Sequence, residues 1–359
     1  MEFSDAVQNE SSSLAQTNIE PQVRLRSLQQ PYHQPVGDCE MNKIITGAIL
    51  ALSISVSNAA LAVEKVNIGA PAWTGAQAIA HLIQEIVVTK IGGEANLVPG
   101  DNAAIFAAMD ASKGDIDVHP DVWLPNQKSF TDKYVDGTGK VALSENPYEG
   151  KQSFCISKQF SEANNVTSIF DLARPEIAKL MDSDGNGKGE IWIGAPGWAS
   201  ANVNQVKVRD YGLLPFMEAV RADQSVMTAT VGDSIKKGIG YAFYCYSPHA
   251  IWFQHDVVRL QEPAFDPAKY KALQPSQDPN WYENSKVMTE DALKKVQIAY
   301  SKSLAERSPA ITDLLKNIKL TGDDVSNFAF QIEGGKPAAQ VAKEWVAANS
   351  DRVDSWLGL

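Results

Sequence analysis

The chain has 359 residues, of which 44% are hydrophobic and 21% are charged. This composition is typical of soluble globular proteins, and the length is sufficient for two domains with their own cores. The formal net charge is −11, and no basic stripe runs along the sequence. The charge therefore argues against nucleic acid as a partner and gives no reason to expect binding to anionic membranes.

The first 62 residues differ from the rest in composition. Residues 1–40 are rich in Ser, Gln and Pro and show no hydrophobic period, so we expect a disordered or wrongly annotated extension. Residues 41–62 combine a short positively charged start, an apolar stretch and small residues at the expected cleavage site. That combination predicts a secretory signal peptide that starts at Met41, and hence an exported, periplasmic protein.

Hydrophobic periodicity from residue 63 onward predicts an α/β protein. The first stretch alternates strands and helices in the order β-α-β-α-β, which is typical of a parallel sheet. Ligands of such sheets bind at the carboxyl ends of the strands. The predicted elements are a strand at 66–70, a helix that begins at Thr74, a strand at 96–98, a helix at 102–111 and a strand at 116–118.

A second α/β unit follows, and the chain from about residue 289 is predicted to be mostly helical. We interpret the pattern as two lobes, each a mixed sheet flanked by helices, with a ligand cleft between them. Lobe one contains residues 63–150 and 249–359 in this interpretation, and lobe two contains residues 151–248. The elements predicted for the second unit are a strand at 153–157, a helix at 168–181, a strand at 191–195, a helix at 199–210 and a strand at 241–246.

Four of the eight tryptophans follow predicted strands and have Pro or Gly close by. They are Trp73, Trp123, Trp198 and Trp252. Trp is rarely placed in loops for packing alone, so the pattern predicts an aromatic cage for a ligand cation. The alternative for Trp73 and Trp123 is a hydrophobic plug between the lobes, and Trp252 is equally compatible with burial under its own short helix.

Several motifs occur in a fixed order along residues 63–359. They are Asp121-Val122-Trp123-Leu124-Pro125, Gly197-Trp198, Ser247-Pro248-His249 and, near the end, Lys343-Glu344-Trp345 with Trp356-Leu357-Gly358. This order resembles the glycine betaine/choline type of substrate-binding protein from ABC importers. The resemblance implies a two-lobed periplasmic binding protein, not an enzyme, that closes on quaternary ammonium osmolytes. It also implies a monomer without a required cofactor that delivers its ligand to an ABC permease in the inner membrane.

One position departs from that family. The residue after Pro-His is often a cage Trp in the family, whereas Ala250 follows His249 here. Trp252, Tyr244 and Tyr246 are the candidates to complete the cage in its place. Glycine betaine, choline, trimethylamine N-oxide and dimethylsulfoniopropionate present similar methylated groups, and the sequence does not rank them.

A betaine also carries a carboxylate, which needs hydrogen-bond donors. Gly197 and Ala199 lie where a predicted helix begins, and free backbone N–H groups at such a terminus bind anions. An ordinary capped helix is the alternative. His119 and His249 are further candidate donors, although a histidine beside a proline more often supports its own loop.

Two other classes of function remain as alternatives. A binding protein for a different small solute, such as an amino acid, would need Arg and Asp in the cleft, whereas these loops offer aromatic rings. A periplasmic hydrolase would need catalytic residues, and the sequence has no nucleophile elbow, zinc motif, P-loop or dinucleotide fingerprint.

A short acidic segment resembles a calcium-binding loop. Oxygen-bearing residues alternate with small residues, and Gly187 occupies the sixth position, where a tight turn is needed. The twelfth position is Ile193 instead of Glu, so the alternative is an acidic surface turn. The predicted ligands of a structural Ca²⁺ are Asp182, Asp184, Asn186, Lys188 and Glu190.

Two cysteines, Cys155 and Cys245, remain after the predicted cleavage. Both lie in predicted strands near the two ends of lobe two, so we expect them on the strands that cross between the lobes. Export permits a disulfide, and two buried thiols are the alternative.

Overall fold

The structure is a computed structural model, and it describes residues 63–359. The predicted extension and signal peptide lie outside the described residues. Residues 63–359 lie within one compact unit. Among the residues that the structure describes, no helix has both the length and the apolar character needed to cross a membrane.

The sheet of the first lobe begins with a parallel arrangement, as predicted. Its strand order is β2-β1-β3-β12, with β1 parallel to β2 and β3, and β12 antiparallel to β3. Helices α1 (Thr74–Ile86) and α2 (Asn102–Ala111) connect the first three strands. The strands are β1 (Lys65–Ala70), β2 (Glu94–Pro99), β3 (Val118–Leu124), β4 (Val141–Leu143), which pairs with β12, and β12 (Lys294–Ser301).

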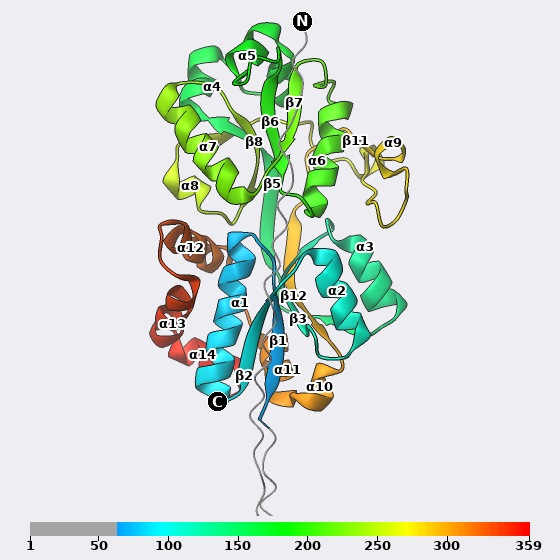
Figure 1. Cartoon of the computed structure of the whole chain (residues 1–359), viewed down its shortest axis with the longest axis vertical. Helices are drawn as coiled ribbons and strands as arrows, with labels where there is room; N and C mark the ends of the chain where they lie inside the picture. Colours follow the sequence, from blue (N-terminus) through cyan, green and yellow to red (C-terminus); the bar gives the residue numbers. More distant parts are fainter. Residues whose placement is uncertain (1–62) are drawn as a thin grey trace, which may run out of the picture. The chain divides into compact units, whose positions relative to one another are not determined.

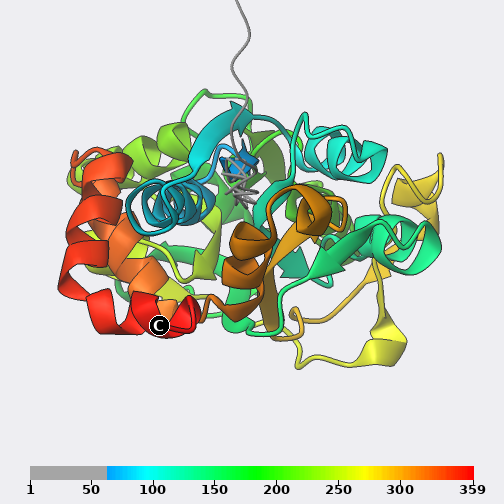
Figure 2. The same ribbon diagram turned by 90° about the horizontal axis from the view of Figure 1, so that it is seen from below.

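Helices cover this sheet on both sides (Figure 1). The buried face of α1 carries Ile79, Leu82, Ile83 and Ile86 at helical spacing, and its burial fixes the helix against the sheet. The C-terminal helices, drawn in red, lie against α1 (Figure 2). The remaining helices of this lobe are α3 (Lys128–Thr131), α10 (Leu304–Arg307), α11 (Pro309–Asn317), α12 (Gly322–Glu333), α13 (Ala338–Ala348) and α14 (Ser350–Trp356), with π-helical turns at Val87–Ile91 and Asp132–Gly137.

The sheet of the second lobe has the order β5-β8-β6-β7. Strand β5 (Tyr148–Ser157) joins the two sheets, because its first residues pair with β12 and the following ones with β8. The other elements are α4 (Lys158–Asn164), α5 (Pro175–Leu180), β6 (Gly189–Gly194), α6 (Ala199–Asp210), β7 (Met217–Arg221), α7 (Gln224–Lys237), β8 (Ala242–Ser247), α8 (Ile251–Gln254), β9 (Val257–Arg259), β10 (Tyr270–Lys271), α9 (Trp281–Asn284) and β11 (Lys286–Val287), with 3-10 turns at Ile169–Ala173 and Pro267–Lys269.

Three predicted elements differ from the observed ones. The strand predicted at 116–118 is β3, which continues to Leu124, so Trp123 lies in a strand and not in a loop. The ladder between β3 and β12 shifts opposite Pro120 and Asp121, because a proline cannot donate to a strand partner and is accommodated at a β-bulge.

The helix predicted at 168–181 is divided at Pro175 into a 3-10 turn and α5. Strand β12 lies inside the region predicted to be mostly helical.

The second crossing between the lobes comes later than the sequence suggested. Strand β9 pairs with β5, and Gln261 forms a bridge with Ser168, so residues 257–261 lie with the second lobe and not with lobe one. The chain enters the first sheet again at β12. Hydrophobic periodicity does not reveal this later crossing, because a three-residue strand such as β9 is too short to show a period.

Cys155 and Cys245 form a disulfide, with a Cα–Cα distance of 5.7 Å. The bridge joins β5 to β8, which are antiparallel neighbours in the sheet of the second lobe. The predicted position was therefore wrong for Cys245, since β8 does not cross between the lobes. The disulfide reinforces one sheet and does not tie the two crossings together.

Candidate functional site

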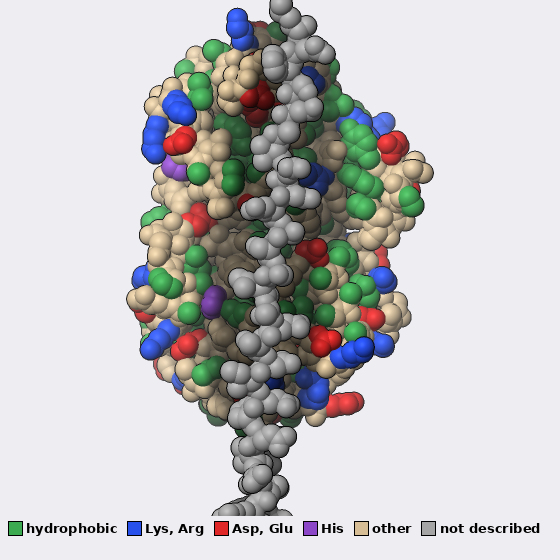
Figure 3. Space-filling model, in the orientation of Figure 1, with side chains coloured by type: hydrophobic (Ala, Val, Ile, Leu, Met, Phe, Trp, Pro, Cys, Tyr) green, Lys and Arg blue, Asp and Glu red, His purple; other side chains and the backbone are tan. Residues whose placement is uncertain are grey.

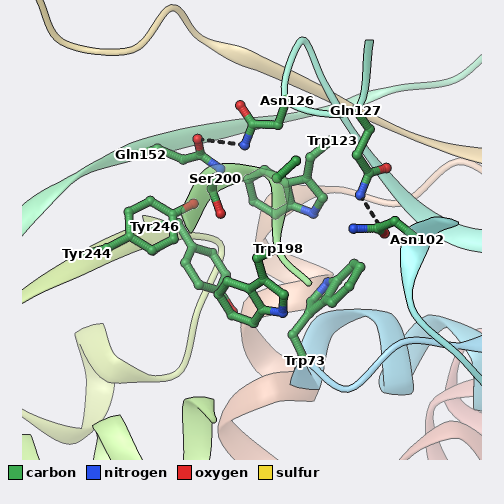
Figure 4. Close-up of a pocket in the computed structure, with 11 residues that line it drawn as sticks. Trp73, Asn102, Trp123, Asn126, Gln127, Gln152, Trp198, Ser200, Tyr244 and Tyr246 are labelled. Atoms are coloured by element: carbon green, nitrogen blue, oxygen red, sulfur yellow. Dashed lines mark hydrogen bonds between the residues drawn. The ribbon is translucent and has the colours of Figure 1, made fainter. Parts of the chain in front are cut away.

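A cavity lies between the two lobes. Aromatic rings and side-chain amides dominate its lining, and none of its lining residues carries a formal charge (Figure 4). Its position at the carboxyl ends of β1, β3 and β6 is the one expected for a sheet of this type. The lining residues are Trp73, Asn102, Trp123, Asn126, Gln127, Gln152, Trp198, Ala199, Ser200, Tyr244 and Tyr246.

Local backbone features bring the rings to this cavity. Trp73 and Trp198 are the N-cap residues of α1 and α6, directly after β1 and β6. Gly197 has a φ of +80°, which few other residues adopt, and so forms the turn that presents Trp198. A Cβ atom at Gly150 would overlap the ring of Trp123, so this position in β5 must be glycine for the ring to lie where it does.

The rings meet mostly edge to face. Trp73 and Trp198 have centroids 5.9 Å apart and an interplanar angle of 79°. Tyr246 stands at 82° to Trp123, with the centroids 5.5 Å apart, and at 75° to Trp198, with the centroids 6.0 Å apart. All of these rings line the same cavity, and the faces of aromatic rings carry the negative part of their quadrupole. The cavity is therefore suited to a cation that has no hydrogen-bond donors.

A buried carboxylate holds two of these rings. Asp121 is fully buried and accepts hydrogen bonds from Trp73 Nε1 at 2.5 Å and from Trp123 Nε1 at 3.0 Å. The hydroxyl of Tyr148 donates to its other oxygen. Burial raises the pKa of Asp121, although the bonds from Tyr148, Trp73 and Trp123 favour its ionised form. The carboxylate thus fixes both indoles from behind the cavity wall.

Four amide side chains form a polar wall. Gln127 Nε2 donates to Asn102 Oδ1 at 2.9 Å, and Asn126 Nδ2 donates to Gln152 Oε1 at 3.0 Å (Figure 4). Because these amides also line the cavity, they can turn donors or acceptors toward a polar end of a ligand. None of the four was predicted from the sequence, since single Asn and Gln residues carry no pattern.

The first turn of α6 forms another polar part of the lining. Ala199 and Ser200 line the cavity, and no side chain caps the helix. The first backbone N–H groups of a helix lack partners within the helix and favour negative charge. A carboxylate at this terminus would therefore be stabilised.

The two predicted histidines lie outside the lining. His119 Nε2 is 2.9 Å from Asn102 Oδ1, so this ring supports the amide wall. His249 packs edge-on against Tyr246, with the ring centroids 4.6 Å apart, and its Nδ1 accepts from the backbone N–H of Ile251. Burial lowers the pKa of both histidines to about 3. Both are therefore neutral near pH 7 and provide no positive charge.

Trp252 also lies outside the lining. Its indole N–H donates to the carbonyl of Tyr246 at 2.8 Å, and the guanidinium of Arg259 stacks over its ring at 4.1 Å. The residue supports Tyr246 from behind. Tyr244 does line the cavity, because residues two apart in β8 point to the same side of the sheet as Tyr246.

Polar contacts join the lobes around the cavity. Gln224 of α7 donates to Thr74 and to Glu333, at 2.9 Å in each case, and accepts from the hydroxyl of Tyr246. Asn102 Nδ2 lies 3.4 Å from the carbonyl of Gly197. The cavity residues of the two lobes are thus linked directly.

The acidic loop of the second lobe is a compact turn. Asp182, Asp184 and Glu190 each place one carboxylate oxygen within 4.8 Å of the others. Backbone N–H groups of Gly185 and Gly187 donate to Asp182. Asn186 donates to Asp184, whereas the ammonium of Lys188 bonds to the carbonyl of Leu214. The arrangement leaves the calcium site a prediction.

On the face shown in Figure 3, acidic and basic side chains are interspersed, and no single basic patch gathers there.

The fold and the uncharged aromatic cavity together define a two-lobed binding protein. Residues 64–348 match the family model "Substrate binding domain of ABC-type glycine betaine transport system". The chain belongs to this family, as the motifs predicted.

Relatives of known sequence agree with this assignment. The chain is 27% identical over 220 residues to the "Glycine betaine-binding periplasmic protein OusX" of Dickeya dadantii (strain 3937). It is 26% identical over 217 residues to the "Glycine betaine/proline betaine-binding periplasmic protein" of Salmonella typhimurium. Each alignment covers 57% of this chain and 63% of the relative, so less than two thirds of either relative is matched.

Solved structures confirm the two-lobed fold. Lactococcal OpuAC in its closed conformation with glycine betaine has a TM-score of 0.63 at 21% identity, covering 82% of this chain and 99% of that one. An ABC-transporter choline binding protein in complex with choline also has a TM-score of 0.63, at 17% identity, covering 82% and 92%. The expectation of a binding protein instead of an enzyme is likewise confirmed by the family.

Proposed function

We propose that this protein captures a small methylated onium compound, glycine betaine or a close analogue, in the cavity between its lobes. The observation that carries this proposal is the group of rings from Trp73, Trp123, Trp198 and Tyr246 around one uncharged space. A trimethylammonium group donates no conventional hydrogen bonds, so ring faces and shape are what can hold it. Each cation–π contact contributes about 0.5–2 kcal/mol, and several together support micromolar binding.

The polar parts of the lining favour a ligand with an anionic end. The first turn of α6, at Ala199 and Ser200, offers backbone donors to a carboxylate. Glycine betaine joins a trimethylammonium group and a carboxylate through one carbon, so it satisfies both walls at once. Choline has no carboxylate for the first turn of α6. Its trimethylammonium group would contact the rings, and its hydroxyl would bond to the amide wall.

We further propose that the protein works in the periplasm and delivers its ligand to an ABC permease in the inner membrane as a monomer. The leader-like pattern of residues 41–62 supports export. Relatives that carry the word periplasmic in their names support the same compartment.

Isothermal titration calorimetry tests the ligand. We expect saturable one-to-one binding of glycine betaine, and titrations with choline, trimethylamine N-oxide and dimethylsulfoniopropionate rank the analogues. The variant Trp281→Phe is a matched control, because Trp281 packs with Tyr282 outside the cavity. No saturable heat with any of the four compounds would contradict the proposal, and binding of an amino acid alone would favour a different solute.

A further inference from the structure

Asp121 collects hydrogen bonds from three separate segments of the chain. Trp73 comes from the N-cap of α1, Trp123 from β3 and Tyr148 from β5. Both indole N–H groups share Oδ2, and the tyrosine hydroxyl donates to Oδ1. Asp121 lies at the bulge in β3, which aims its side chain at these donors.

All of these donors are neutral groups. No lysine, arginine or histidine among residues 63–359 forms an ion pair with Asp121, although its side chain is fully buried. The nearby His119 is not a counter-charge, because its Nδ1 accepts the backbone N–H of Asp121 and burial keeps the ring neutral. Buried carboxylates are usually paired with a cation or a metal, and an unpaired one is costly. In its ionised form, Asp121 is therefore a negative charge without a cationic partner among residues 63–359.

The carboxylate of Asp121 lies next to the cavity. The indoles that donate to Asp121 are two of the rings that line the cavity, so the carboxylate lies directly behind them. An anion that accepts an indole N–H bond increases the electron density of that ring, which strengthens attraction to a cation at its face. Because the carboxylate is fully buried, its field is weakly screened and also reaches the cavity itself.

We propose that Asp121 is the charge-selecting residue of this site. It orients two indoles of the cage and supplies the counter-charge that makes the cavity prefer a cationic methylated group over an uncharged group of the same shape. Asp121 acts through the rings and does not line the cavity, so it is a positioning residue. This inference rests on the proposed function, because it concerns the same cavity.

The substitution Asp121→Asn separates charge from geometry. An asparagine carbonyl in place of Oδ2 can accept both indole N–H groups, and its amide can donate to the oxygen of Tyr148. The hydrogen-bond pattern is thereby kept while the negative charge is removed. Tyr148→Phe is the matched control, since it removes one hydrogen bond and keeps the charge.

A pair of ligands isolates the effect of charge. Glycine betaine and the tert-butylacetate anion have the same shape, but carbon replaces the positive nitrogen in the second. We measure the dissociation constants of both at pH 8 by calorimetry and compare their ratio between variants. The ratio cancels any change in ring position that affects both ligands equally.

We expect the wild-type protein to prefer glycine betaine strongly and Asp121→Asn to reduce that preference about tenfold or more. Tyr148→Phe should leave the preference within about twofold. An unchanged ratio in Asp121→Asn would overturn the inference and leave the proposed function intact. If the wild-type protein bound neither ligand nor the other onium compounds, the proposed function itself would fail.

Folding of the variant is checked separately by thermal unfolding. Asp121→Leu serves as a second neutral variant if Asp121→Asn does not fold, and the same ratio is measured. A wild-type preference below about threefold would overturn the inference whatever the variants show, because the rings alone account for a small preference. Failure of both variants to fold would assign Asp121 to the scaffold and would also overturn the inference.

Discussion

Two aspartates, Asp121 and Asp291, are almost completely buried but have opposite electrostatic surroundings. Asp121 has only neutral donors around it, and burial raises its pKa. Asp291 contacts the ammonium groups of Lys207 at 2.7 Å and Lys294 at 2.8 Å. Burial opposes ionisation of Asp291 as well, but the two lysines outweigh it and hold the pKa of that carboxyl well below its usual range.

The difference separates a scaffold site from the proposed binding site. The cluster around Asp291 also contains Glu262, which bonds to Lys207 at 2.8 Å, so its positive and negative charges balance within the protein. It fastens α6 to the segment that enters β12, and with it the first turn of α6 that lines the cavity. At Asp121 the balancing charge is missing, and a bound cation would supply it. Substitutions at the first site should therefore change stability, and substitutions around the second should change affinity.

The largest expected effect is on stability, from Lys207→Met. Lys207 is fully buried, and its removal leaves Asp291 and Glu262 with only Lys294 as a cationic partner. Breaking a buried charge cluster in this way costs about 3–5 kcal/mol of unfolding free energy. Urea unfolding measures the loss, and Lys236→Met is the control because its ion pair with Asp233 is largely exposed. Equal losses in the two variants would show that the buried cluster is not a scaffold.

Loss of the disulfide is expected to cause the second-largest decrease in unfolding free energy. The bridge closes a loop with a sequence separation of 90 residues, and removal of such a bridge costs about 2–4 kcal/mol. Because both cysteines lie in one sheet of the second lobe, glycine betaine affinity should stay the same in the double variant Cys155→Ala and Cys245→Ala. Unfolding and calorimetry on the same sample measure both quantities. A weakened affinity would show that the bridge constrains the relative positions of the lobes.

Trp73→Ala should have the opposite effect to loss of the disulfide, because it should change ligand affinity more than stability. The variant loses one cage ring and one donor to Asp121, so affinity for glycine betaine should fall about tenfold or more, or roughly 1–2 kcal/mol. The control Trp252→Phe keeps a ring behind Tyr246 and should change affinity by less than about threefold. Calorimetry compares the two. Equal affinity losses would place Trp252 in the cage, against the observed lining.

The sequence predicted the fold better than the details of the site. Periodicity placed α1 and β1 because their buried faces repeat at helical or strand spacing over many residues. Trp73, Trp123, Trp198 and Tyr246 were predicted because each is a large aromatic at a recognisable strand end or motif, and all of them line the cavity. Their roles in ligand binding stay predictions.

The remaining features depend on contacts that no local pattern records. Trp252 and His249 were included because they follow Pro248 in the motif, yet neither lines the cavity, and their side chains contact Arg259 and the backbone of Ile251. The amide of Gln152 reaches the cavity only because β5 passes between the two sheets. A single residue placed by long-range topology leaves no periodic signal in the sequence.

Acid should affect the scaffold through Asp291. Its pKa is lowered in the folded protein, so its ionised form adds stability above the unfolded pKa of about 3.9, and this stability is lost as the pH falls below that value. The difference in unfolding free energy between the wild-type protein and Asp291→Asn should be constant near neutral pH. Below about pH 4 it should shrink by up to about 1.4 kcal/mol per pH unit. A difference that stays constant down to pH 2 would contradict the paired state of Asp291.

Calcium is expected to have the smallest effect, because most of its predicted ligands lie in an exposed turn before β6, away from both buried aspartates. Asp182, Asp184 and Glu190 can direct oxygens to one ion, and binding to the folded state alone would stabilise it. At about tenfold excess over its dissociation constant, calcium should add on the order of 1 kcal/mol to the unfolding free energy. Thermal unfolding with EDTA and then with added calcium measures this shift, and Asp184→Asn should abolish it, whereas Asp233→Asn should not. Identical melting curves with and without chelator would identify the loop as an acidic surface turn whose backbone N–H groups already satisfy its carboxylates.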